Sequence, residues 1–166
     1  MAESLFEAPA PHLAVLDIDG TLLTSAGEIL PSTRRAIGAL IARGHHVVLA
    51  SARPPRSVAA LSRDLIGEGA AGLISLNGAL VSRGTSILLE RCILPPTTAA
   101  IVRAARARSL TISLYSGWHW KADELTAALR EEASILGFEP LLVGDLTGQT
   151  DPVHKLLTLG DAAEIE

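Results

Sequence analysis

The chain of 166 residues contains a single cysteine, Cys92, which excludes a disulfide framework within the chain. A lone cysteine of this kind is expected to be a small buried apolar residue rather than a nucleophile. Only 3% of the residues are aromatic, so aliphatic side chains must fill the interior within a hydrophobic content of 48%. This composition is typical of alternating strands and helices and unlike that of a disordered chain.

The sequence also lacks an excess of positive charge and a long apolar run. A net charge of −4 argues against general nucleic-acid binding, which needs a basic face to displace counterions. No apolar run approaches the roughly 20 residues of a membrane span. The first eleven residues lack the basic start of a secretory signal. These absences predict a soluble, cytoplasmic protein with no nucleic-acid or membrane partner.

The first half of the chain alternates between apolar strands and helices. Strands are predicted over 12–17, 46–50 and 72–76, with helices over 32–43 and 57–66 between them. The first strand reads as one that is buried on both faces of a parallel sheet. Strand–helix–strand–helix–strand with short connections predicts a right-handed parallel α/β sheet.

The pattern changes after Asn77-Gly78. Two strands are expected at 79–82 and 86–93, joined by a hairpin turn. The later segments predict a helix over 95–108, a strand over 111–115, a helix over 123–136, and short strands over 140–143 and 154–159. We therefore divide the chain near residue 80, into a partial Rossmann-like core (1–80) and an inserted α+β domain (81–166).

The strongest local signal follows the first strand and reads Asp17-Ile18-Asp19-Gly20-Thr21. Two carboxylates two residues apart at the carboxyl end of a strand project into the crevice where open α/β sheets bind ligands. One carboxylate and a backbone carbonyl can share a hard cation such as Mg²⁺, and Thr21 offers a hydroxyl to phosphate. One acid can act as nucleophile while the other handles the leaving-group proton. The alternative is an ordinary Asp-Gly turn.

Two more polar segments end the second and third strands. The first reads Ser51-Ala52-Arg53-Pro54, and the second contains Asn77-Gly78. Ser51 can donate a hydrogen bond to a phosphoryl oxygen, or it can serve as the N-cap of the next helix. Asn-Gly on its own is only a turn signal. Because the three strands are expected to be parallel, the three polar segments should meet at one edge of the sheet.

These segments resemble the first signatures of phosphatases of the haloacid dehalogenase (HAD) superfamily, in particular the Cof-type subgroup with an α/β cap. The resemblance implies that Asp17 forms an aspartyl-phosphate and that Asp19 is the general acid and then the base. It implies Mg²⁺ held by the Asp17 carboxylate and the Asp19 backbone carbonyl, and a small phosphorylated metabolite, such as a sugar phosphate, as substrate. It assigns phosphate binding to Thr21, Ser51, Ala52, Arg53, Asn77 and Gly78. Ala52 departs from the subgroup's usual glycine.

The resemblance continues through the cap, over 114–120 and 154–161. Trp118, His119 and Trp120 are expected to face the substrate, or, for at least one tryptophan, to pack inside the cap. Asp161 is interpreted as part of a cap turn. The superfamily's later signatures are a lysine and a Gly-Asp strand end with a further acid. By resemblance they belong to a returning core segment beyond the cap, which we do not find before Glu166.

Two alternatives stay open. Lys121 and Asp145, with Asp151 six residues further on, could be the later signatures of a short, capless phosphatase. That spacing is wider than usual, and the hairpin and helix over 79–108 would be surplus in a minimal core. The second alternative is a truncated or vestigial chain of this kind, with little activity, that acts as a binding module. The unfinished sheet would then meet a second copy in a homodimer.

Overall fold

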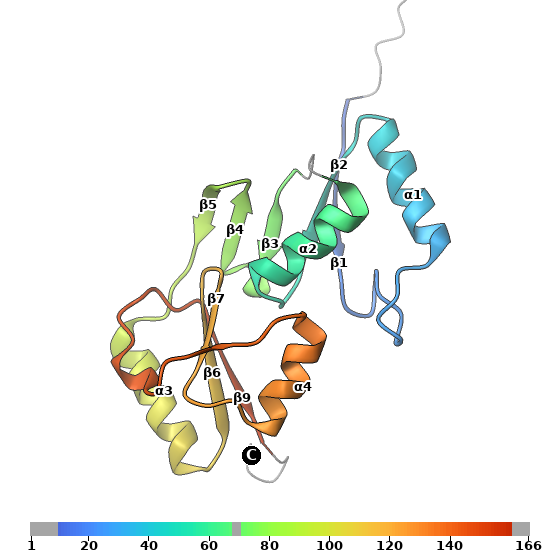
Figure 1. The fold of residues 1–166 in the computed structure, drawn as a ribbon. Helices are drawn as coiled ribbons and strands as arrows, with labels where there is room; N and C mark the ends of the chain where they lie inside the picture. The colour runs from blue at the N-terminus through green and yellow to red at the C-terminus, as the bar shows by residue number, and fades with distance from the viewer. Residues whose placement is uncertain (1–9, 68–70, 161–166) are drawn as a thin grey trace, which may run out of the picture.

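The computed structural model describes residues 10–67 and 71–160, which form two sheets in separate parts of the molecule (Figure 1). The first sheet has the strand order β1-β2-β3-β4-β5, and the second has the order β8-β7-β6-β9. The predicted α/β class is confirmed. None of the helices in these ranges is both long and apolar enough to cross a membrane.

The first sheet opens with the predicted parallel strands. They are β1 (Leu13–Asp17), β2 (His46–Ala50) and β3 (Leu73–Ser75), connected by α1 (Pro31–Ala42) and α2 (Pro55–Ile66). The register pairs Asp17 with Ala50 and Ala50 with Ile74. The three strands therefore end side by side, and the segments that follow them meet at one edge of the sheet.

One face of this sheet is covered and the other is open. Apolar side chains of the two helices and the strands form a buried cluster of Ile18, Leu22, Ile37, Val47, Leu49 and Val58. On the opposite face Leu13 is 62% exposed and Val15 is 50% exposed. The prediction that this first strand is buried on both faces is wrong, because β1 is the edge strand and no described helix covers its second face.

The predicted hairpin exists but belongs to the first sheet. It consists of β4 (Leu80–Arg83) and β5 (Ser86–Glu90), and β4 pairs antiparallel with β3 from Ser75↔Leu80 onward. We expected this hairpin in the second lobe. The chain reverses so tightly over Leu76–Gly78 that the next strand satisfies the free edge of β3. The change of sheet therefore falls after Glu90 rather than near residue 80.

The second sheet and its helices form what we call the cap lobe, and the first sheet with α1 and α2 is the core lobe. The cap lobe contains α3 (Pro95–Ala107), β6 (Thr111–Ser116), β7 (His119–Ala122), α4 (Ala127–Leu136), β8 (Leu141–Leu142) and β9 (Lys155–Leu159). Strand β7 was not predicted. It follows β6 through a turn in which Gly117 has φ 54°, a conformation that glycine adopts readily.

Helix α4 begins four residues later than predicted. The Thr126 hydroxyl accepts a hydrogen bond from Leu129 N at 3.3 Å and caps the helix. Asp123 was the expected first residue, but its carboxylate accepts a hydrogen bond from Leu146 N at 2.7 Å. Asp123 therefore does not start the helix; its side chain holds the segment before α4 against the loop that follows β8.

A hydrophobic cluster joins the two lobes. Leu76 and Leu80 of the core lobe pack with Tyr115, Trp120 and Leu129 of the cap lobe. The Trp120 ring is stacked on that of Tyr115 with centroids 5.8 Å apart. We call these five residues the interlobe cluster; each is almost completely buried, so the lobes share a core at this point.

Replacing Trp120 with alanine should lower the free energy of unfolding by roughly 3–5 kcal/mol, because it removes a large side chain from the interlobe cluster. Urea denaturation followed by circular dichroism measures this change. Trp118→Ala is the matched control, since Trp118 is 46% exposed, and it should cost less than about 1 kcal/mol. Equal costs for the two variants would contradict the shared core.

Candidate active site

Asp17, Ser51 and Asn77 lie around one cavity of about 310 Å³ at the carboxyl edge of the core sheet. The rest of its lining is Ala50, Ala52, Ile74 and Gly78. We call this space the Asp17 cavity. Its residues come from the ends of the three parallel strands, as the register requires.

Backbone hydrogen bonds tie the loop after β2 to the turn after β3. Ser51 N donates to Ile74 O at 3.0 Å, and Asn77 N donates to Ser51 O at 3.1 Å. Leu76 N donates to Arg53 O at 3.0 Å. The pairing between neighbouring strands thus continues past their ends, so the two polar segments have a fixed relative position.

Ser51 is buried, with a relative exposure of 6%. Its hydroxyl oxygen accepts a hydrogen bond from Arg53 N at 3.1 Å, which leaves the hydroxyl hydrogen free to donate to a bound oxyanion. The N-cap of α2 is Pro54, with no side-chain capping bond. The interpretation of Ser51 as that helix's cap is therefore wrong.

The turn that carries Asn77 has an unusual backbone. Leu76 has φ 53° and Asn77 has φ 59°, backbone angles that residues other than glycine and asparagine rarely adopt. Such conformations persist where the surroundings enforce them. Here the side chain of Leu76 is buried in the interlobe cluster, while Asn77 is exposed at the Asp17 cavity. Packing of the cap lobe thus holds the asparagine in place.

Asp17 lies exposed at the end of β1. The Thr21 hydroxyl donates to the Oδ2 atom of Asp17 at 3.4 Å. This hydroxyl is therefore directed at the carboxylate, whereas it was assigned to phosphate binding from the sequence. Within the described ranges no cation forms an ion pair with Asp17. The carboxylate is therefore accessible from the cavity.

Asp19 is held by Arg53. The Arg53 Nη2 atom lies 2.7 Å from Oδ1 of Asp19, and Nε lies 3.0 Å from Oδ2. This is the forked geometry in which a guanidinium binds both oxygens of a carboxylate. Arg53 was assigned to phosphate binding from the sequence, but in this structure its fork is engaged by Asp19.

A second cavity of about 520 Å³ lies beside Asp19 and Arg53. Its wall includes hydroxyl and apolar side chains from both lobes: Leu23, Thr24, Ser25, Leu61, Ser134 and Ile135. Sequence reasoning did not find this space, because the residues of the loop after Asp19 and of the end of α4 carry no recognisable pattern.

Comparison with known proteins identifies the family of the chain. The family model for haloacid dehalogenase-like hydrolases matches residues 14–166. The chain belongs to this hydrolase family. No curated protein matches the sequence.

Solved structures share the fold of this family member. A haloacid dehalogenase-like hydrolase from Bacteroides thetaiotaomicron has a TM-score of 0.84 and 27% identity, over 94% of this chain and 60% of that chain. A protein from Thermotoga maritima has a TM-score of 0.78 and 22% identity, over 93% and 58%. A HAD subclass IIB sugar phosphatase has a TM-score of 0.76 and 18% identity, over 94% and 61%. The last two are similar in fold alone. The chain thus spans about 60% of the length of the first of these structures.

Lys121 and Asp145 lie apart from the Asp17 cavity. Lys121 is buried in β7, where its ammonium binds Gln149 Oε1 at 2.9 Å and the carboxylate of Asp151. Neither lines the Asp17 cavity or the cavity beside Asp19. Their positions in the cap lobe do not support the short, capless phosphatase. Asp161 lies outside the described residues.

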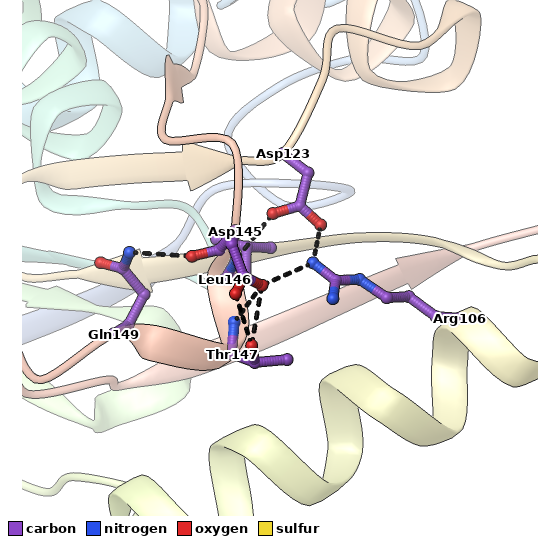
Figure 2. Close-up of polar contacts among 6 residues, drawn as sticks. All are labelled: Arg106, Asp123, Asp145, Leu146, Thr147 and Gln149. Carbon is purple, nitrogen blue, oxygen red and sulfur yellow. Dashed lines mark hydrogen bonds and ion pairs between the residues drawn. The ribbon is translucent and has the colours of Figure 1, made fainter.

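Asp145 belongs to a network that closes the loop after β8, shown in Figure 2. Its carboxylate accepts hydrogen bonds from Thr147 N at 3.0 Å and from Arg106 Nη2 at 3.0 Å, and Arg106 also binds Asp123. The bonds from Thr147, followed by that from Arg106, lower the pKa of Asp145 to about 2. Asp145 is therefore part of a hydrogen-bond network within the cap lobe.

None of the three residues Trp118, His119 and Trp120 lines the Asp17 cavity. Trp120 packs in the interlobe cluster, as expected for at least one tryptophan. Trp118 lines a different cavity, beside Gly84 and Thr85 of the β4–β5 turn. The expectation that these residues face a substrate at Asp17 finds no support.

Cys92 is exposed, so the prediction that it is buried is wrong. It lies in the linker between the two sheets, near His154 and Glu90. Among the described residues these three form the one group of metal-capable donors. His154 Nδ1 accepts a hydrogen bond from Gly117 N at 3.0 Å, so a neutral ring carries its proton on Nε2, 3.0 Å from Glu90 Oε1. The ring therefore donates to Glu90, and Cys92 Sγ lies 3.8 Å from the same Nε2 atom.

Proposed function

We propose that this chain carries the nucleophile of a phosphate-monoester hydrolase that acts through an aspartyl-phosphate. The supporting observation is that Asp17 is exposed beside one cavity with the Ser51 hydroxyl and Asn77, while a second acid lies two residues further on. A nucleophile, hydrogen-bond donors for an oxyanion and a separate acid are what this reaction requires.

In the proposed mechanism an oxygen of Asp17 attacks phosphorus, and the bond between phosphorus and the leaving oxygen breaks. Asp19 donates a proton to that oxygen. Asp19 then takes a proton from water, which attacks phosphorus, releases inorganic phosphate and restores Asp17. The Ser51 hydroxyl and the Asn77 amide donate to phosphoryl oxygens, and the backbone bonds of the loop keep them in position.

Mg²⁺ is the metal that this family implies, and the donors present fit it. The Asp17 carboxylate is a hard oxygen donor that is exposed at the cavity and has no competing ion pair within the described ranges. We propose that Asp17 and the backbone carbonyl of Asp19 hold the ion. When bound, it would offset negative charge on the phosphoryl group.

For the substrate we propose a small phosphorylated metabolite, such as a sugar phosphate, in the cytoplasm. The cavity beside Asp19 supports this class, because its hydroxyls (Thr24, Ser25 and Ser134) can bond to the hydroxyls of a leaving group. Its volume of about 520 Å³ is in the range of small-molecule sites. One solved structure of similar fold is a sugar phosphatase.

Asp17→Asn should reduce any hydrolysis of p-nitrophenyl phosphate by at least about 10³-fold, since an amide cannot attack phosphorus. Asp64→Asn is the matched control: Asp64 forms an exposed ion pair with Arg34 in the core lobe and does not line either cavity. It should keep wild-type activity. The assignment of Asp17 as nucleophile would be wrong if the Asp17→Asn variant hydrolysed the ester near the wild-type rate and had an unchanged circular dichroism spectrum.

The 166-residue chain should bind Mg²⁺ weakly and turn over slowly. Two protein ligands fall short of the six oxygens that Mg²⁺ prefers, and water must complete the shell. No lysine and no further acid line the Asp17 cavity in the parts of the chain that are described. Each missing charge stabiliser typically costs on the order of 10²–10³ in rate. Isothermal titration with a parallel turnover assay measures both quantities, and tight binding with ordinary turnover would contradict this expectation.

A homodimer is a second proposal, supported by the open edge of β1. This strand ends the sheet order, and Leu13 and Val15 are exposed on its uncovered face. Unpaired strand edges associate readily with one another.

Sedimentation velocity should show a dimer at tens of micromolar, and Val15→Lys should shift it to monomer, because a charge on an edge strand opposes pairing. Ile101→Lys is a control that also replaces an exposed aliphatic residue by lysine, at a position 37% exposed on α3 of the cap lobe, and it should remain dimeric. If the wild-type chain sediments as a monomer at that concentration, the proposed homodimer is wrong.

A further inference from the structure

Arg53 contacts both lobes with a single side chain. Besides the fork on Asp19, its Nη1 atom donates to the backbone carbonyl of Ile135 in the cap lobe at 3.2 Å, and lies 3.5 Å from Ser57 Oγ. All three guanidinium nitrogens are therefore engaged, and the Arg53 side chain is only 17% exposed. The Asp19 side chain, by comparison, is 55% exposed.

The carbonyl that Arg53 binds belongs to the end of a helix. Ile135 is the last residue but one of α4, which ends at Gly137 with φ 81°. The last carbonyls of a helix lack partners within it and carry partial negative charge, so a cation there is stabilising. The last turn of α4 contains no basic residue of its own. Arg53, from the core lobe, supplies the missing cation.

The neighbours of Arg53 also contact the cap lobe. Lys155 Nζ of β9 donates to the carbonyl of Ala52 at 3.0 Å, and the Arg56 guanidinium lies 4.7 Å from the centre of the Phe138 ring. The loop after β2 and the start of α2 thus make two hydrogen bonds and one cation–π contact to the cap lobe. Arg53 is the one of these residues that also binds Asp19.

We propose that Arg53 is a positioning residue that couples the docking of α4 to the orientation of Asp19. With α4 docked, the carbonyl of Ile135 fixes the guanidinium, and the fork fixes the Asp19 carboxylate at the boundary between core and cap. When α4 moves away, the guanidinium loses that anchor and Asp19 gains freedom. Only the catalytic meaning of this coupling rests on the proposed function, in which Asp19 transfers the proton.

Coupling between two contacts is reciprocal, so it can be observed from the core side without any turnover. Asp19→Asn keeps the size of the side chain but removes the charge that holds the fork. Hydrogen–deuterium exchange of the full chain, read at amides 133–138, should then accelerate by about fivefold or more. Arg53→Gln should accelerate the same amides at least as much. The double variant should add little to Arg53→Gln, because both changes remove one network.

Two variants serve as controls. Asp64→Asn breaks the 2.6 Å ion pair between Arg34 and Asp64 within the core lobe, and should leave exchange in α4 unchanged. Asp17→Asn removes the proposed nucleophile and should also leave it unchanged. If Asp17→Asn loses turnover while exchange in α4 stays normal, the test of the proposed nucleophile is independent of the test of the Arg53 coupling.

The proposal is overturned if Asp19→Asn leaves amides 133–138 at the wild-type rate while Arg53→Gln accelerates them. Arg53 would then cap α4 without coupling it to Asp19. Equal acceleration in α1 and α4 also overturns it, since that pattern reports a loss of overall stability. A phosphatase assay that shows no turnover counts against the proposed function only, because the exchange rates that test the coupling require no substrate.

Discussion

The burial of Leu76 and Leu80 among the cap lobe's aromatic side chains is the contact on which the rest of the structure depends. Both leucines are almost fully buried, and each contributes on the order of 1.5–3 kcal/mol through that burial. They flank the turn that carries Asn77, where Leu76 and Asn77 have positive φ angles. Packing between the lobes therefore offsets the strain of a turn that lies at the Asp17 cavity.

Polar contacts complement this apolar anchor. The loop after β2 binds the cap lobe through Arg53 and through the carbonyl of Ala52, and its backbone is bonded to the turn after β3. Hydrophobic burial has little directional preference, whereas hydrogen bonds depend on angle and distance. The interlobe cluster thus holds the lobes together, and the polar contacts set how the end of α4 meets Asp19. Chemistry at the site and docking of the cap lobe consequently share the same few residues.

Local patterns predicted much of the fold and part of the site. The parallel strands and their helices were found because apolar periodicity and helix boundaries are properties of neighbouring residues. Asp17, Ser51 and Asn77 were brought together on the expectation that parallel strands end at one edge, and the structure places them around one cavity. Strand β7 was missed because it follows β6 directly through a glycine turn, over residues to which no element was assigned. The start of α4 was placed too early because the helical pattern was extended back past the capping Thr126.

The amino-acid sequence by itself determined most of the order of strands and helices, the acids after β1 and the family, because these depend on residues close together in the chain. Tertiary structure decided the rest. The exposure of β1 and Cys92, the pairing of the hairpin with β3, and the partners of Lys121 all follow from which segments happen to lie alongside them. Arg53 is the clearest case. Its contacts reach Asp19, 34 residues before it, and Ile135, 82 residues after it, and only folding brings these three into one network.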